Sequence, residues 1–547
     1  MNPSIFLKIL KSFSRRELFV FAASFLLFLI SLSFLTIDFI ESNTKIIPID
    51  SGKYIEGAVG QPSFVNPLIA ASGVDLDLIA LTFSDLKNLA ESYKVDEKGT
   101  IWRYRLKEGV FWHDGQPIFS DDIIFSVEAV QNPDAYSPLF QSWRGVKARR
   151  ISEREVEFEL VSPYVFFKNT IEEFRPLPKH IFKDLPAANI RLSEYNLKPI
   201  GSGPYKFSAF KKQDNGYIDF YALERNENYF GAKPHIAKFN FAFYQNEESV
   251  INAFNKGAID GFNLTNPDNL SKIKLPHQIL SAKSLKYYAI FINQHSQAAL
   301  NDKNVRFALN QAINKKELVE KVFQNYAQVA DGPLVPGAEE IASNSFDPSE
   351  SDKILEATGW AWGSENIREK TTEKETIKLE FNLTIPEIPF LIETADFIKN
   401  SWSKIGVKTN ISIHPLPAVN NEIIKARDYQ TIIFGNIIGK NSDLFSFWHS
   451  SERFYPGLNL ALYENSSADK LIESIRQNFN DEKRQTDLAS LQSIIVQDYP
   501  AIFLFSPDYI YVSKKNLGGF EADFVSLPGE RFENIEKWHV KTARVFK

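Results

Sequence analysis

The chain has 547 residues, 44% of them hydrophobic, which exceeds what one hydrophobic core usually supports and predicts at least two lobes. Its 62 basic and 68 acidic residues give a net charge of -6, so the basic footprint of a nucleic-acid-binding protein is excluded. Cysteine is absent, which excludes disulfides, thiolate metal sites, a cysteine nucleophile and a thioether-linked lipid at the N-terminus.

An uncharged, mostly apolar run covers residues 18–37. At about 1.5 Å per residue, a helix of this length crosses a hydrocarbon core of roughly 30 Å. Basic residues precede the run and acidic residues follow it, so the positive-inside rule places residues 1–17 in the cytoplasm. We therefore predict a transmembrane anchor at residues 18–40, with everything after about residue 41 outside, either extracellular or periplasmic.

A cleaved signal peptide is the alternative interpretation of this run. The apolar region of a signal peptide is usually only roughly 7 to 15 residues long, and no A-x-A-like cleavage site follows the run here. Because no cysteine is present to carry a lipid, a retained helix is expected to hold the protein in the cell membrane as a single-pass protein.

The first predicted elements after the anchor are two strands and a helix. In residues 101–106 two arginines fall on one face of an extended chain, and Trp102, Tyr104 and Leu106 fall on the other, which is typical of a half-buried strand. After a turn at Asp114-Gly115, Ser120 is expected to cap a helix whose first turn is acidic. A second strand follows at residues 155–160, where glutamates alternate with apolar residues.

The middle of the chain continues with strands and one short helix. Asn215-Gly216 favours a tight turn between strands at 205–207 and 217–223, which predicts a hairpin. Residues 247–256 indicate a helix that Gly257 ends, and residues 287–293 indicate a buried strand.

The last part of the chain carries the clearest α/β pattern. Strands at 377–383 and 407–413 flank a helix that Gly406 ends, which favours parallel pairing of the two strands. A helix and a strand follow at 421–427 and 429–435. Two further helices at 468–479 and 483–498 and a strand at 501–505 complete the pattern. No repeat or long Gly/Ser linker separates independent domains, so the lobes are expected to share strands.

Catalytic and metal motifs find little support. The eight histidines form no H-E-x-x-H pattern, and His113-Asp114 lies in a predicted turn, so we predict no catalytic residues, no metal and no cofactor. The serine at residues 201–203 lacks the spacing of a nucleophile elbow, and residues 435–440 lack that of a phosphate loop. A glycosidase carboxylate pair stays open, because only the separation of two carboxylates in space would reveal it.

Several segments, in the same order along the chain, resemble the family 5 extracellular solute-binding proteins, which include oligopeptide, dipeptide and nickel receptors. The resemblance spans about residues 55 to 515. It rests on residues 102–130 (WRYRLKEGVFWHDGQPIFSDDIIFSVEAV), 201–205 (GSGPY), 223–231 (LERNENYFG), 253–260 (AFNKGAID), 305–314 (VRFALNQAIN), 346–360 (FDPSESDKILEATGW), 405–407 (IGV) and 498–500 (DYP).

This resemblance implies an α/β, two-lobed, periplasmic-binding-protein-like type II fold with an inserted subdomain, preceded here by one transmembrane helix. The inserted subdomain is expected at residues 79–197 and lobe II at residues 293–505. Lobe I is expected to combine three separate segments, residues 41–78, 198–292 and 506–547.

The resemblance also implies a function in ligand binding, with no catalysed reaction. The expected protein is the substrate-binding subunit of an ABC importer, which closes its lobes on a peptide or peptide-like ligand and delivers it to permease and ATPase subunits. We expect a monomer and no enzyme activity. A cell-surface glycan or peptide hydrolase is one alternative, and a non-transporting peptide sensor or structural display protein is another.

Within the family, the segment after the strand at 429–434 pairs with an extended peptide through backbone groups. In this chain the expected ligand-binding residues are Gly435, Asn436, Ile437, Ile438, Lys440 and Asp443. Phe140, Trp143 and Phe445 are predicted to form apolar pocket walls, with ordinary core packing as the alternative for each.

The resemblance also bears on which end of a peptide is recognised. Relatives place an aspartate after the residue that corresponds to Gly435, where it pairs with the ammonium group of the ligand. The corresponding residue here is Gly439 or Lys440, so we predict no selection for a free α-amino group. An alignment shifted by three residues would instead give that role to Asp443.

Overall fold

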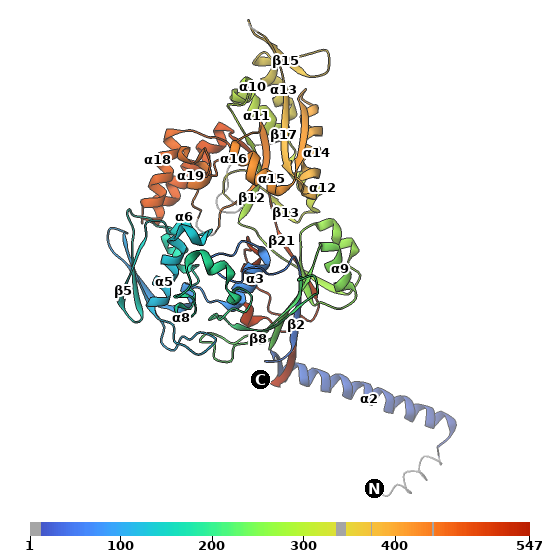
Figure 1. The fold of residues 1–547 in the computed structure, drawn as a ribbon. Helices are drawn as coiled ribbons and strands as arrows, with labels where there is room; N and C mark the ends of the chain where they lie inside the picture. The colour runs from blue at the N-terminus through green and yellow to red at the C-terminus, as the bar shows by residue number, and fades with distance from the viewer. Residues whose placement is uncertain (1–12, 335–345, 374, 440–441) are drawn as a thin grey trace.

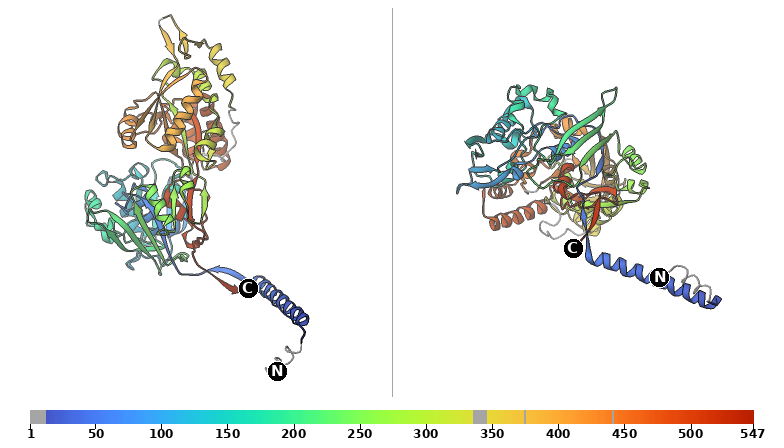
Figure 2. Two further views of the ribbon diagram at one scale, coloured as in Figure 1. Left: turned by 90° about the vertical axis from the view of Figure 1, so that its right-hand side faces the viewer. Right: turned by 90° about the horizontal axis from the view of Figure 1, so that it is seen from below.

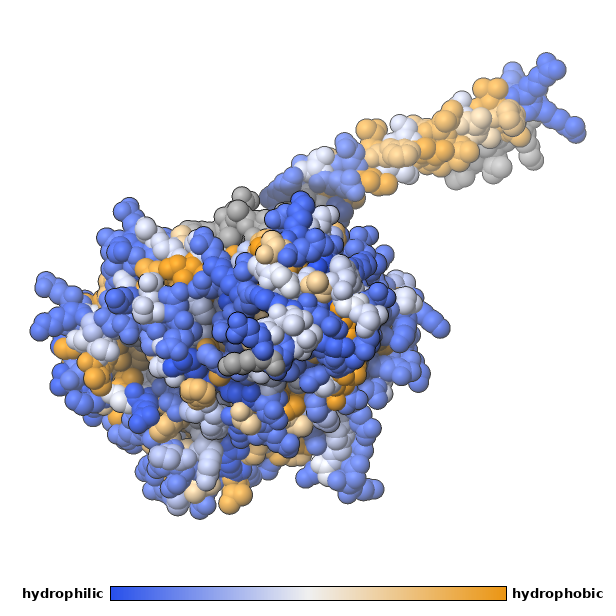
Figure 3. Space-filling view, turned by 90° about the horizontal axis from the view of Figure 1, so that it is seen from above, coloured by the Kyte–Doolittle hydropathy of each residue, from blue (hydrophilic) through white to orange (hydrophobic). Residues whose placement is uncertain are grey.

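Helix α2 (Arg15–Asn43) precedes a body of two lobes in the computed structural model, which describes residues 13–334, 346–373, 375–439 and 442–547 (Figure 1). The side chains of Ser14 and Glu17 form a capping box at its start, and none of its residues is buried. Within the described residues it is the one helix long and apolar enough to cross a membrane, a property that a signal sequence shares. Figure 3 shows it as an apolar rod beside a largely hydrophilic body.

A two-stranded ribbon joins this helix to the body. Strand β1 (Thr44–Pro48) follows the helix directly and pairs antiparallel with β22 (Thr542–Phe546), so that Thr44 lies opposite Phe546. The Lys547 amide donates to the Asn43 carbonyl over 2.9 Å, and its ammonium group donates to the Ser42 carbonyl over 2.8 Å. Lys547, directly after β22, therefore fixes the C-terminal end of α2 by hydrogen bonds.

The lower lobe, lobe I, is built on a seven-stranded sheet with the order β11-β21-β10-β2-β9-β8-β7. Helix α3 (Gly73–Thr82) packs on one face and α9 (Glu247–Asn255) packs on the other. The β7–β8 hairpin and α9 confirm two predictions from the sequence. The strands come from three separate stretches of the chain: β2 (Lys53–Val59), β7 (Tyr205–Lys212), β8 (Ile218–Arg225), β9 (Lys238–Tyr244), β10 (Gly261–Leu264), β11 (His277–Ala282) and β21 (Tyr509–Lys514).

A buried charge network fastens these stretches together. Arg531, 1% exposed, donates to both carboxylate oxygens of Asp77, over 2.6 and 2.8 Å, and to Glu56 over 2.9 Å. The Tyr511 hydroxyl also donates to Glu56. Burial raises the pKa of Glu56 to about 7, although the charge of Arg531 opposes this rise. One guanidinium group thus forms ion pairs with two carboxyl groups in the core.

A smaller sheet with the order β3-β4-β6-β5 forms a subdomain beside lobe I. It comprises β3 (Ala90–Val95), β4 (Ile101–Leu106), β5 (Lys147–Ser152) and β6 (Glu155–Glu159), and α5 (Ser120–Gln131) packs on it. The prediction that Ser120 caps α5 is wrong, because its hydroxyl donates to the Ser152 carbonyl of β5 over 2.6 Å. Asp122 instead accepts a hydrogen bond from the Phe119 amide over 2.8 Å.

The upper lobe, lobe II, is built on a six-stranded sheet with the order β13-β20-β12-β19-β17-β18. Helices α11 (Lys303–Gln311), α12 (Lys315–Phe323) and α14 (Pro389–Ser403) contribute to the core on one face, and α18 (Ser466–Gln477) and α19 (Asp481–Asp498) to the core on the other. The predicted parallel β17–α14–β18 unit is confirmed. The strands are β12 (Lys286–Ile292), β13 (Ala327–Val329), β17 (Glu380–Pro386), β18 (Lys408–His414), β19 (Thr431–Ile437) and β20 (Ala501–Pro507).

The chain crosses between the two sheets twice, at residues 283–285 and at Asp508 (Figure 2). Ser506, near the end of β20, donates from its hydroxyl to the Ser284 carbonyl over 3.0 Å, so a hydrogen bond links the two connections. We name residues 283–285 and Asp508 together the hinge. The predicted boundary at residue 292 needs correction, because β12 pairs with β19 and β20 inside lobe II. The predicted end of lobe II at residue 505 moves to Pro507 for the same reason, because Ser506 and Pro507 pair with β13. The other predicted boundaries stay proposals.

Candidate functional site

The end of β19 offers an unpaired strand edge at the hinge. On one side β19 pairs with β12 along its whole length, whereas on the other side β17 pairs only with Thr431 and Ile432. The Ile438 amide donates to the Leu285 carbonyl over 2.9 Å, on the β12 side. Because backbone groups alternate along a strand, those of Gly435 and Ile437 point to the opposite edge. No described strand pairs with that edge beyond Ile432.

Gly435 is required by the aromatic ring beside it. A Cβ atom at this position would lie 2.9 Å from Cε1 and 3.0 Å from Cζ of Tyr288, so the outer half of that ring lies across the strand. Phe390 packs edge-on against the Tyr288 ring at 5.3 Å, and Phe505 lies on it at 5.5 Å. These contacts hold Tyr288 over Gly435, and any larger residue there would displace it.

The other predicted residues of this segment differ in the solvent exposure of their side chains. Asn436 is 3% exposed and donates to the Tyr287 hydroxyl over 2.9 Å, so its side chain belongs to the core. Ile438 is also buried, whereas Ile437 is 45% exposed. Strand β19 extends through Ile437, two residues beyond the predicted end of the strand at Gly435. Lys440 lies outside the described residues.

Asp443 joins lobe II to the subdomain. Its Oδ2 accepts a hydrogen bond from the Tyr164 hydroxyl over 2.7 Å and lies 3.3 Å from Nε of Arg476. The guanidinium group of Arg476 lies over the rings of Phe445, at 4.1 Å, and Tyr164, at 4.8 Å. We name Tyr164, Asp443 and Arg476 the clasp. Burial, and then the nearby Asp443 charge, raises the pKa of Tyr164, so its hydroxyl stays protonated and donates.

Further contacts between the lobes surround the clasp. The Val165 amide donates to the Arg476 carbonyl over 2.8 Å, and the Phe479 and Trp102 rings lie 6.1 Å apart. A cavity of about 480 Å³ opens beside them and is lined from both the subdomain and lobe II, including Tyr93, Trp102, Lys168, Phe479 and Arg484. The lobes therefore meet at the clasp as well as at the hinge.

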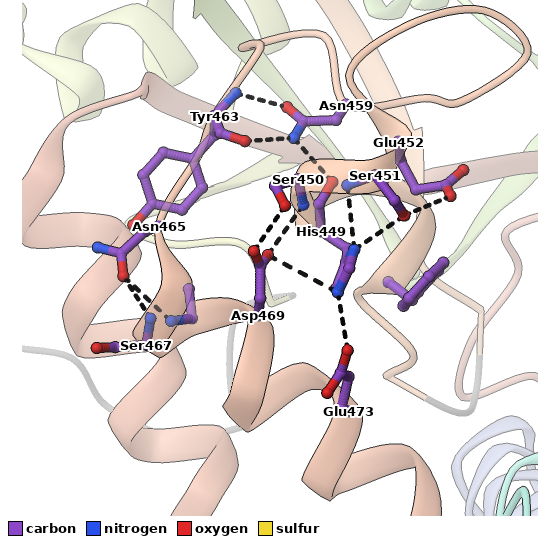
Figure 4. Close-up of polar contacts among 12 residues, drawn as sticks. His449, Ser450, Ser451, Glu452, Asn459, Tyr463, Asn465, Ser467, Asp469 and Glu473 are labelled. Atoms are coloured by element: carbon purple, nitrogen blue, oxygen red, sulfur yellow. Dashed lines mark hydrogen bonds and ion pairs between the residues drawn. The ribbon is translucent and has the colours of Figure 1, made fainter.

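Phe445 also packs on a polar group that superficially resembles a hydrolase triad (Figure 4). Nδ1 of His449 lies 2.9 Å from the Ser451 hydroxyl, and Nε2 lies 3.5 Å from Glu473 and 3.9 Å from Asp469. However, Nδ1 already accepts the Ser451 backbone amide over 3.1 Å, so its lone pair caps a short helical turn. That lone pair is not free to take a proton from the serine, which favours a structural role.

Two predicted pocket walls lie in the subdomain. Trp143 is 1% exposed and packs against Phe158, Phe167 and Phe174 at 4.5 to 5.7 Å, which corrects its assignment: it belongs to the core. Phe140 is partly buried in the adjacent turn of helix, and its predicted role stays a prediction.

Four residues near the site were not predicted from the sequence. Two are Tyr164 and Arg476 of the clasp. The others are Lys286 and Tyr288 of β12, which lie opposite Ile437 and Gly435 of β19. Nothing local in the sequence distinguishes them, because each acquires its partner or its exposure only through tertiary structure.

Two lobes joined by paired crossings, with an open strand edge at the hinge, define the class of two-lobed periplasmic binding proteins. The profile described as "Bacterial extracellular solute-binding proteins, family 5 Middle" matches residues 87–454, and the chain belongs to this family.

Individual relatives agree with this assignment. The oligopeptide-binding protein AppA of Bacillus subtilis is 25% identical, with 90% of this chain and 92% of that protein aligned. The dipeptide-binding protein of Escherichia coli is 22% identical, with 87% and 93% aligned. The solved structure of AppA with a nonapeptide has a TM-score of 0.72 at 24% identity and covers 90% of this chain and all 100% of its own. The structure of CtaP from Listeria monocytogenes has a TM-score of 0.78 at 23% identity, with 90% and 100% covered.

Proposed function

We propose that this protein is the extracytoplasmic substrate-binding subunit of an ABC importer for peptides or peptide-like solutes. The observation that carries the proposal is the edge of β19 at Gly435 and Ile437, whose backbone groups can pair with an extended chain. Backbone pairing does not depend on ligand side chains, so a broad range of ligands is expected. Relatives named as oligopeptide- and dipeptide-binding proteins support this ligand class.

Closure of the lobes follows from the same arrangement. The edge lies in lobe II beside the hinge, and a ligand that also touches lobe I would favour the closed arrangement over the open one. The clasp would form only in the closed arrangement, because Tyr164 belongs to the subdomain beside lobe I and Asp443 belongs to lobe II. Asp443 thus has partners of its own, which favours closure as its role over binding of a ligand ammonium group.

The proposed partners are permease and ATPase subunits, and the receptor itself is proposed to be a monomer. Helix α2 would act as the retained anchor, with residues 1–17 in the cytoplasm and the lobes outside. The permease would then receive ligand from a receptor in the same membrane.

Replacing Ile437 tests the strand edge directly. Ile437→Pro removes the one amide N–H that this residue turns to the open edge, and Ile437→Val keeps it. With the full chain in lipid nanodiscs and an equimolar tripeptide mixture, we expect the proline variant to capture at least about tenfold less peptide, a loss of roughly 1.4 kcal/mol. Equal capture by both variants would exclude this edge as the site, and release of cleaved peptide would favour a hydrolase.

A further inference from the structure

Lys286 stands where the hinge enters lobe II. It is the first residue of β12 and lies opposite Ile437, the last residue of the open β19 edge. The preceding residues are fixed, since Leu285 accepts the Ile438 amide and Ser284 accepts the Ser506 hydroxyl. The backbone of Lys286 is therefore held in a defined position beside the open end of β19.

No described residue neutralises this lysine. Lys286 is partly buried, and within the described part of the chain it forms no hydrogen bond and no ion pair. Burial lowers its pKa, and no neighbouring charge opposes this effect. Lys315 shows the usual arrangement, because its ammonium group lies 3.1 Å from the Asp331 carboxylate. A desolvated ammonium group without a counter-charge is costly, so the place beside Lys286 suits an anion.

Tyr288 adds a second donor at the same place. It follows Lys286 by two residues, so both side chains project from one face of the strand, roughly 7 Å apart at their Cα atoms. Cε1 and Cζ of its ring lie 2.9 and 3.0 Å from the place of a Cβ at Gly435, so the hydroxyl-bearing end of the ring lies beside β19. That hydroxyl has no hydrogen-bond partner among the described residues, and burial raises its pKa to about 12, so it stays protonated.

We propose that Lys286 and Tyr288 together bind a carboxylate group of the ligand at the open end of β19. This proposal rests on the proposed function, since the rest of the ligand pairs with Gly435 and Ile437. An ammonium group and a hydroxyl both donate to carboxylate oxygens, and the charge-assisted bond is the stronger of the two. The receptor thereby selects ligands by their acidic group.

Two sources can supply this carboxylate: the C-terminus of a peptide and an acidic side chain. The probe is an equimolar mixture of tripeptides Ala-X-Ala, with X as Glu, Gln, Leu or Lys, each as the free acid and as the C-terminal amide. The full chain in nanodiscs captures peptides from the mixture, and mass spectrometry reads the ratio of acids to amides and of Glu to Gln peptides.

We expect the wild-type protein and Lys286→Arg to enrich carboxylate-bearing peptides at least about tenfold. Lys286→Met, which keeps most of the apolar stem, should reduce this enrichment to below about threefold, and Tyr288→Phe should reduce it less. Lys399→Met is the matched control, because Lys399 is exposed on α14, and it should behave as the wild type.

Each outcome decides the proposal. A preference for free acids over amides that Lys286→Met removes identifies the C-terminal carboxylate, and a preference for Glu over Gln that it removes identifies the side chain. Equal capture of charged and neutral peptides by the wild type, or an unchanged preference in Lys286→Met, overturns the proposal while peptide binding stands. Capture of no peptide by the wild type overturns the proposed function as well.

Discussion

Arg531 in lobe I and Arg476 in the clasp both pair with carboxylates and lie over aromatic rings, but they differ in burial. Arg531 is 1% exposed, bonds two carboxylates and lies 4.0 Å over the Phe532 ring. The side chain of Arg476 is 30% exposed, pairs with Asp443 and lies over two rings. Loss of the Arg531 ion pairs leaves buried charges without partners. Loss of the Arg476 ion pair is less costly, because water can replace the partners of this more exposed group. The first therefore holds one lobe together, and the second is the weaker contact that the proposed closure would make and break.

The largest effect is expected for Arg531→Met. Removal of the guanidinium group leaves Glu56 and Asp77 buried side by side, which should cost about 3 to 5 kcal/mol of the free energy of unfolding. Urea unfolding of the full chain in detergent, followed by tryptophan fluorescence, measures this. Arg544→Met is the control, because that side chain is 46% exposed and should change stability by about 0.5 kcal/mol or less. A loss below about 1 kcal/mol in Arg531→Met would mean that the network does not stabilise lobe I.

A smaller effect is expected from pH through Glu56. Burial raises its pKa from 4.5 to about 7, so the folded protein binds a proton that the unfolded chain releases between these values. The stability that this proton provides is present below about pH 4.5 and is lost as the pH rises through about 7, by about 3 kcal/mol in total. Glu56→Gln should remove this slope from the unfolding free energy measured between pH 5 and pH 8. An unchanged slope would assign the proton to another group.

The smallest effect on stability is expected for Arg476→Gln. Since its ion pair is partly exposed, the unfolding free energy should fall by about 1 kcal/mol or less. Its effect on shape should be clear, because loss of the clasp frees the lobes to separate and raises the radius of gyration measured by solution scattering. Arg453→Gln is the control, since Arg453 pairs with Glu464 inside lobe II and should leave the radius unchanged. An unchanged radius in Arg476→Gln would show that the clasp does not hold the lobes together.

Local patterns in the sequence predicted much of the fold. The alternation at residues 101–106, the Asn215-Gly216 turn and the β17–α14–β18 unit appear as expected, because each depends on neighbours within a few residues. Ser120 failed as a cap because a distant strand, β5, takes its hydroxyl. Order along the chain, rather than any single motif, identified the family.

The candidate site was harder to predict, because its contacts join distant parts of the chain. Tyr164 and Asp443 are 279 residues apart in sequence, and no local pattern marks them as partners. The segment at Gly435 was expected from the resemblance, but its open edge depends on where β17 stops pairing. Trp143 was misassigned because an aromatic residue in the sequence carries no sign of whether it lies in a core or beside a ligand.

The ribbon of β1 and β22 has a mechanical consequence. A single flexible strand would let the body swing and rotate about α2. Two hydrogen-bonded strands, with Lys547 also bonded to the Ser42 and Asn43 carbonyls, resist bending and twisting. If α2 is retained in the bilayer as proposed, lobe I would keep a fixed height and orientation above the lipid. In the proposed closure lobe II would then make the larger movement, and the proposed permease in the same membrane would always meet the receptor from the same side.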